Sequence, residues 1–129
     1  MEPNFHKCCR NKEAQVYNLG SKGKRNRLLL GLFAMVTSLG YASALVVLGC
    51  HWVWRFSLFL PVFFGVLLLL QARTRTCVAL AALGAWDLDC GTQHIPDPDL
   101  ERRLRHRAYM LVGAAAAAAL LMTGLFALV

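Results

Sequence analysis

Charged side chains are missing from three long stretches of this sequence. No Asp, Glu, Lys or Arg occurs from Leu28 to Trp54, from Phe56 to Ala72 or from Ala108 to Val129. About 20 apolar helical residues are enough to cross a hydrocarbon core about 30 Å thick. Hydrophobic residues make up 57% of the chain, against about 45 to 50% in an average soluble domain. These runs therefore predict an integral membrane protein.

The same stretches offer few groups for chemistry. Their polar side chains include Thr37, Ser38, Tyr41, Ser43, Ser57, Gln71 and Thr123, and no acidic residue is among them. Ion-coupled transport depends on ionisable groups inside the membrane, so a transporter acting alone is disfavoured. The sequence also lacks a catalytic triad pattern and a glycine-rich phosphate loop. We therefore expect no enzymatic activity, no catalytic residue and no cofactor.

Positive charge lies at the edges of the apolar runs. The chain has 14 Lys and Arg against 7 Asp and Glu. Seven of the basic residues precede Leu28, six lie between the second and third runs, and only Arg55 lies between the first and second. Lys and Arg near span ends stay on the cytoplasmic side. The pattern predicts three spans, with the N-terminus cytoplasmic and the C-terminus outside.

Anionic lipid head groups are the expected partner of these basic residues. Nucleic-acid binding is not expected, because the Lys and Arg residues border apolar spans and do not form a soluble face with interleaved aromatics. Side chains suited to anchor the spans at the lipid interface are Arg25, Arg27, Trp52, Trp54, Arg55, Arg73, Arg75, Trp86, Arg107 and Tyr109. We expect Arg55 to extend its guanidinium outward to the head groups.

The predicted fold is all-α: an integral membrane helical bundle of three transmembrane helices plus a short interfacial helix. We expect a basic cytoplasmic tail over residues 1–27 and a membrane domain over 28–129. The spans should cover about residues 28–50, 52–72 and 108–129. The first helix should begin near Arg27, and Pro61 predicts a kink in the second.

The segment between the second and third spans is too short to cross the bilayer again. Residues 76–86 are apolar, and they could be interfacial, re-entrant or packed in the bundle. Residues 87–98 contain one glycine and two prolines, which predicts an irregular cytoplasmic loop. Asp97 followed by Pro98 is typical of a helix N-cap with proline at the first helical position. The third helix should therefore begin about ten residues before the membrane.

Small residues recur at helical spacing in two spans. Ala34, Ser38 and Ala42 form one stripe on the first helix, and Gly113 and Ala117 form a pair on the third. Small residues let helix backbones approach closely, which is how membrane helices associate. These positions could pack within the chain, the favoured interpretation, or against the helix of a partner.

Cysteine and histidine side chains are the remaining chemical candidates. A cytoplasmic metal site could be built from His6, Cys8, Cys9, Cys90 and His94, since thiolate and imidazole ligands suit zinc or copper(I). Their spacing does not match the two-cysteine pairs of common zinc modules. Reduced, unligated thiols are the favoured interpretation.

The start of the first span carries a short motif, formed by Asn18, Gly20, Lys24, Arg27 and Gly31. Over about residues 18–65 the chain resembles small bacterial inner-membrane hairpin proteins of unknown function, similar to the membrane anchor of some rhodanese-type sulfurtransferases. The chain departs from that pattern at Gly23, where the family usually has an acidic residue, and at Val78, where it has proline after the cysteine. The third helix lies outside the pattern.

The resemblance implies a helical protein of the bacterial inner membrane, often dimeric, without an assigned activity. It supplies no catalytic residue and gives Cys77 no sulfur-handling role. We therefore expect a small multi-span membrane protein that acts as an accessory, structural or assembly subunit, packing its helices with a second copy or a larger membrane complex. The alternative is a metal or sulfur-relay protein that uses cytoplasmic Cys and His residues.

Overall fold

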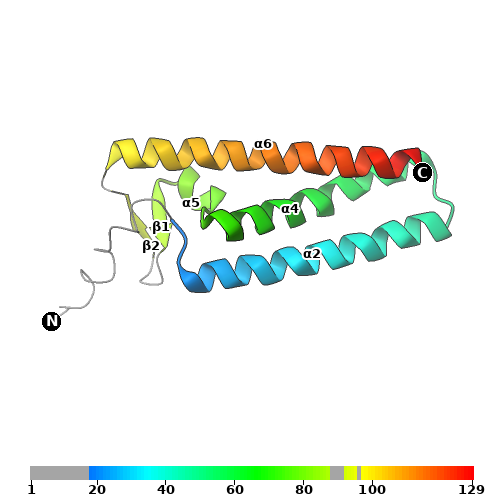
Figure 1. Cartoon of the computed structure of the whole chain (residues 1–129), viewed down its shortest axis with the longest axis horizontal. Coiled ribbons are helices and arrows are strands. Elements are labelled where there is room, and N and C mark those ends of the chain that lie inside the picture. Colours follow the sequence, from blue (N-terminus) through cyan, green and yellow to red (C-terminus); the bar gives the residue numbers. More distant parts are fainter. Residues whose placement is uncertain (1–17, 88–91, 96) are drawn as a thin grey trace.

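Three long helices lie side by side in the computed structural model, which describes residues 18–87, 92–95 and 97–129 (Figure 1). They are α2 (Ser21–Val47), the continuous helical run from α3 (Trp52–Arg55) through α4 (Phe59–Thr74), and α6 (Pro98–Leu128). Each is long and apolar enough to cross a membrane. The predicted fold class, a helical membrane bundle with three spans and a short additional helix, is confirmed.

The first and third helices extend beyond the charge-free runs. Helix α2 begins at Ser21, earlier than the start expected near Arg27, so its first turns carry basic side chains. Helix α6 begins at Pro98, where the Asp97 carboxylate accepts a hydrogen bond of 3.0 Å from the Asp99 backbone N–H. This N-cap with proline in the first turn agrees with the sequence prediction.

The second span contains a local irregularity. Between α3 and α4 the chain tightens into a 3-10 turn, η2 (Phe56–Leu58). Pro61 lacks the N–H group that would bond to the carbonyl of Ser57, four residues earlier, and its ring crowds that carbonyl. The disturbance expected at Pro61 therefore lies one turn before it, as a short change of helix type.

Small residues bring α2 and α4 together. A Cβ atom added at Gly31 would lie 3.0 Å from the Leu69 side chain and 3.1 Å from the Leu69 backbone nitrogen. A Cβ atom at Gly65 would lie 2.9 Å from the Met35 sulfur. Glycine at these two positions permits the close approach of the helices, which van der Waals contact then holds together.

Helix α6 completes the bundle through a second apolar contact region. Leu58 and Val62 of the second span pack with Ala119 of α6, and Phe59, Phe63 and Phe126 surround them. At the same end the Tyr41 hydroxyl is 2.7 Å from the Ser57 hydroxyl, which itself donates to the Trp54 carbonyl over 2.6 Å. The second span is thus tied to both of its neighbours.

The segment between the second and third spans folds into a short helix and a hairpin. Helix α5 (Val78–Ala82) packs through the fully buried Ala81 on Leu104 and Ala108 of α6. Of the three alternatives for residues 76–86, the structure shows packing against the bundle. Strands β1 (Ala85–Asp87) and β2 (Thr92–His94) then pair antiparallel, with Trp86 opposite Gln93.

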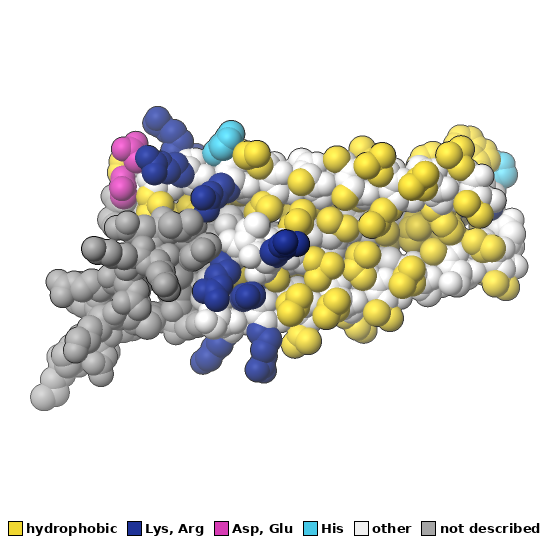
Figure 2. Space-filling model, in the orientation of Figure 1, with side chains coloured by type: hydrophobic (Ala, Val, Ile, Leu, Met, Phe, Trp, Pro, Cys, Tyr) yellow, Lys and Arg dark blue, Asp and Glu magenta, His cyan; other side chains and the backbone are white. Residues whose placement is uncertain are grey.

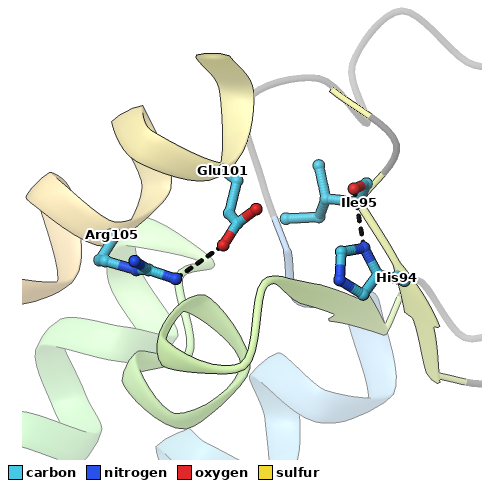
Figure 3. Close-up of polar contacts among 4 residues, drawn as sticks. All are labelled: His94, Ile95, Glu101 and Arg105. Carbon is cyan, nitrogen blue, oxygen red and sulfur yellow. Dashed lines mark hydrogen bonds and ion pairs between the residues drawn. The ribbon is translucent and has the colours of Figure 1, made fainter. Parts of the chain in front are cut away.

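The hairpin corrects the expected irregular loop over residues 87–98. Strands this short carry no readable alternation of apolar and polar residues, so the sequence pattern could not indicate them. Gly84 leads into β1 with a positive φ of 64°, and its carbonyl accepts the Ile95 N–H over 2.9 Å. Figure 3 shows this corner, where Glu101 of α6 binds Arg105 over 2.6 Å and the His94 ring donates to the Ile95 carbonyl over 2.9 Å.

Candidate functional site

The chain before α2 is joined to the hairpin by backbone hydrogen bonds. The Asp87 N–H donates to the Asn18 carbonyl over 2.9 Å, and the Gly20 N–H donates to the Asp87 carbonyl over 2.6 Å. Leu19 and Asp87 thereby form a parallel bridge beside the β1–β2 sheet. Two segments almost seventy positions apart in the sequence are thus fixed to one another.

The Asn18 side chain strengthens this junction. It is fully buried, and its amide makes two hydrogen bonds with the backbone of Cys77. The Asn18 Nδ2 donates to the Cys77 carbonyl over 3.0 Å, and the Cys77 N–H donates to the Asn18 Oδ1 over 2.7 Å. An asparagine amide has one donor side and one acceptor side, so it matches both backbone groups of one residue.

Arg27 reaches the same residue from the second turn of α2. Its Nη2 donates to the Cys77 sulfur over 3.1 Å, and Cys77 is 1% exposed. The neighbouring Thr76 is fully buried and donates its N–H to the Gln71 carbonyl over 3.2 Å. We call Asn18, Arg27, Thr76 and Cys77 the polar junction. Its contacts join segments that are far apart in the chain: Asn18 binds the Cys77 backbone, and Arg27 binds the Cys77 sulfur, which is a weak acceptor.

The polar junction includes two residues of the motif at the start of the first span. Asn18 and Arg27 converge on Cys77, while Gly31 of the same motif contacts Leu69 on α4. Sequence reasoning found the motif but could not predict its target, because Cys77 lies 59 positions after Asn18 and 50 after Arg27. A short Asn-x-Gly segment is a signal of a turn, and it does not identify its partner.

The predicted interface anchors fall into two groups. Most of them are exposed: Arg25, Trp52, Trp54, Arg73, Arg107 and Tyr109. Arg27 is half-buried in the polar junction, and the half-buried Arg75 caps the C-terminus of α4 with a positive φ of 51°. Trp86 has its backbone in β1, and its side chain lies outside the described part of the structure. Contact of these residues with lipid stays a prediction.

The position of Arg55 differs from the expectation. Its guanidinium carbon lies 5.8 Å from the centre of the Phe126 ring on α6, and the side chain is half-buried. Its Nε is buried and has no hydrogen-bond partner among the described residues. Attraction to the face of an aromatic ring accounts for this inward position. The structure therefore does not show Arg55 extending to the head groups.

The two stripes of small residues also have different surroundings. On α2, Ser38 is buried and Ala34 and Ala42 are half-buried, with Ala34 next to Gly65 of α4. On α6, Gly113 and Ala117 are exposed, and no described atom lies within 4 Å of a Cβ added at Gly113. The buried face of α6 is another one, formed by Leu104, Ala108, Ala115, Ala119 and Thr123.

Packing within the chain, the favoured interpretation, is therefore wrong for Gly113 and Ala117. In a run of alanines every face of the helix carries small residues, so spacing alone cannot select the buried one. The alternative for this pair, a partner's helix, stays a prediction.

Most of the metal-site candidates lie outside the described residues, namely His6, Cys8, Cys9 and Cys90. His94 is exposed on β2 and uses its Nδ1 to bind the Ile95 carbonyl. Within residues 18–87, 92–95 and 97–129 no group of three His, Cys, Asp or Glu side chains is arranged to hold a metal ion. The structure brings no set of candidate ligands together in this range.

Comparison of the whole chain with protein-family profiles, with curated proteins and with solved structures finds no match in any of the three. The function is therefore inferred from the geometry of the chain itself. Two features of that geometry stand out: a bundle whose apolar surface is widely exposed, and a polar junction at one end of it.

Proposed function

We propose that this small membrane protein is a non-enzymatic accessory, structural or assembly subunit that works by packing its helices with a second copy or with a larger membrane complex. The observation that supports this proposal is the exposed stripe of α6. Gly113, Ala117 and Gly124 are exposed and lie within about 40° of one another around the helix axis at 100° per residue.

The stripe is suited to contact with another helix. No described atom lies within 4 Å of a Cβ added at Gly113 or Gly124. Leu120 lies on the same face and is 62% exposed. A flat surface of small residues with an adjoining large side chain lets two helix backbones approach closely in lipid, where van der Waals contact drives association.

The proposal includes a location and an orientation. Lys and Arg side chains gather at the end of the bundle where α4 ends and α6 begins, and hydrophobic side chains are spread along the visible face beyond them (Figure 2). Basic residues near span ends are retained in the cytoplasm. On this rule the polar junction lies on the cytoplasmic side and the Val129 end of α6 outside. A bacterial inner membrane is proposed from the resemblance of residues 18–65 alone.

Measuring the mass of the protein after its extraction from native membranes tests the proposal. The full chain, tagged and produced at a low level, is extracted in mild detergent and analysed by native mass spectrometry. We expect a mass above that of the monomer, and we expect Gly113→Leu to shift it to the monomer because leucine keeps the helices apart. Gly40→Leu is the matched control. Gly40 is exposed on α2, and no described atom lies within 4 Å of a Cβ added there.

A wild-type protein recovered only as a monomer would contradict the proposal. An equal loss of the complex in the Gly113→Leu and Gly40→Leu proteins would also contradict it, because the α6 stripe would then have no special part. Both substitutions replace an exposed glycine in a helix, so neither should prevent folding.

A further inference from the structure

A groove opens between the end of α4 and α6, at the basic end of the bundle. It is lined by Thr74, Thr76, Arg107, Met110, Leu111 and Ala114 and has a volume of about 350 Å³. Small-molecule sites typically have volumes of about 300 to 1,000 Å³. The groove is therefore large enough to hold part of a lipid, such as the upper portion of one acyl chain.

The lining changes from cationic to apolar along α6. Arg107 is the last charged residue before the charge-free run that begins at Ala108, so it marks the level of the lipid head groups. Met110 and Ala114 follow on the same helix face at three and seven residues, and Ala114 lies about 10 Å deeper at 1.5 Å per residue. Arg103 is exposed and does not line the groove, but its four-residue spacing from Arg107 puts it on the same helix face one turn earlier.

The two threonines are uncharged, and their hydroxyl groups already donate hydrogen bonds to backbone carbonyls. The Thr74 hydroxyl donates to the Leu70 carbonyl over 2.8 Å, and the Thr76 hydroxyl donates to the Thr74 carbonyl over 3.2 Å. Their protons are therefore used within the chain. Arg107 is the charged group of the lining, and guanidinium N–H groups bind phosphate oxygens in a fixed, often bidentate geometry.

We propose that this groove binds one phospholipid with an anionic head group. The phosphate lies at Arg107, with Arg103 adding positive charge, and the first part of one acyl chain lies along Met110, Leu111 and Ala114. The order of charges and apolar groups along the groove matches that of an anionic phospholipid in the cytoplasmic leaflet. The inference rests on the proposed orientation of the basic end but not on the α6 stripe, so it can hold whether or not the stripe binds another helix.

Native mass spectrometry of the purified full chain tests the site. The protein is titrated in detergent with phosphatidylglycerol and, separately, with phosphatidylcholine of the same acyl chains. We expect retention of one phosphatidylglycerol in preference to phosphatidylcholine. One basic residue near a membrane surface contributes about a fivefold change in affinity, so Arg107→Gln should weaken phosphatidylglycerol binding about fivefold. Arg102→Gln, an exposed arginine of α6 outside the groove, is the matched control.

Two further arms separate head group from acyl chain. Ala114→Trp fills the apolar part of the groove and should abolish retention, whereas Ala44→Trp, at an exposed alanine of α2 outside the groove, should leave it unchanged. Phosphatidylglycerol with a photoreactive acyl chain should label residues 110–114. Inorganic phosphate at the same concentration should not displace the lipid.

Several results would overturn the site. They are equal retention of phosphatidylglycerol and phosphatidylcholine, equal effects of Arg107→Gln and Arg102→Gln, and labelling spread over all three helices. Displacement by inorganic phosphate would mean that the groove holds a phosphate ion and not a lipid. Circular dichroism of each variant confirms that the bundle is still folded.

Discussion

The two regions of this molecule are stabilised in different ways. In the apolar body, contact between helices depends on small residues such as Gly31 and Gly65, and many side chains there could be exchanged for others of similar size. At the basic end, the polar junction holds together residues 50 and 59 positions apart through donors and acceptors that match one another. The body determines that the protein can reside in a membrane, and the basic end determines how its segments are arranged.

This contrast indicates which single substitutions should reduce stability most. A buried polar group that loses its partner is costly, because the folded chain offers no replacement for it. A contact between apolar helices is lost only when volume is added or removed. We therefore expect the largest effects in the polar junction and smaller ones in the helix contacts.

The largest effect should follow Asn18→Ala. The substitution leaves the Cys77 N–H buried without a partner and removes one of two donors to the Cys77 carbonyl, which still accepts the Ala81 N–H over 2.9 Å. An unpartnered buried group costs about 1 to 3 kcal/mol, and the lost hydrogen bond to the carbonyl adds about 1 kcal/mol. We expect the free energy of unfolding to fall by about 2 to 4 kcal/mol, measured by SDS titration in mixed micelles with circular dichroism. Asn26→Ala, an exposed asparagine of α2, should have almost no effect. Equal losses in both proteins would show that the polar junction contributes no more to stability than an exposed residue of α2.

The next effect should follow Gly31→Ala in the helix contact. The new methyl group would lie 3.0 Å from the Leu69 side chain and 3.1 Å from its backbone nitrogen, so α2 and α4 must separate. We expect a loss of about 1 to 3 kcal/mol by the same titration. Gly40→Ala on the same helix has open space around it and should be neutral or slightly stabilising. Similar results at the two glycines would mean that the α2–α4 contact is not close.

A smaller difference should separate two glycines with positive φ. Gly84 and Gly49 have φ values of 64° and 60°, so alanine suffers the same backbone strain at both. Only at Gly84 would its Cβ also collide with Glu101, 2.8 Å from the Oε1. We expect Gly84→Ala to lower the thermal midpoint further than Gly49→Ala, by an extra cost of about 1 kcal/mol. Equal midpoints would show that the Glu101 side chain moves away from the new methyl group without loss of stability.

The smallest effect should follow Arg105→Ala. This removes an ion pair of 2.6 Å with Glu101 on the partly exposed surface of α6. Such pairs at four-residue spacing contribute about 0.3 to 0.5 kcal/mol and are screened by salt. We expect a change of that size at low salt and almost none at high salt, with Arg102→Ala as the control. A loss above about 1 kcal/mol would show that this pair stabilises the basic end more than a surface ion pair does.

Much of the apolar body could be predicted from the sequence, and much of the basic end could not. The charge-free runs revealed three long apolar helices, and Asp97 before Pro98 revealed the start of α6, because these signals are local. The contacts of Asn18 and Arg27 with Cys77 are not local, and no periodicity indicates them. The three-residue strands are too short for a pattern. The prediction that Gly113 and Ala117 pack within the chain failed because, beside a run of alanines, spacing does not distinguish one helix face from another.

The inward position of Arg55 has a similar origin. Its place beside Trp52 and Trp54 in the sequence indicated the lipid interface, but the Phe126 ring that it contacts belongs to the far end of α6. Which rings surround an arginine depends on how the helices pack, and this is known only once the bundle is built. The exposed α6 stripe and the groove beside Arg107 depend on the same packing.

Accessibility of two cysteines to a membrane-impermeant maleimide shows whether the two ends of this bundle lie on opposite sides of a membrane. One protein keeps only Cys50, in the turn after α2, and the other keeps only a cysteine introduced by Thr92→Cys in β2. In intact cells we expect labelling of Cys50 alone, with the second cysteine labelled only after permeabilisation. Labelling of both from the same side would contradict the three-span arrangement.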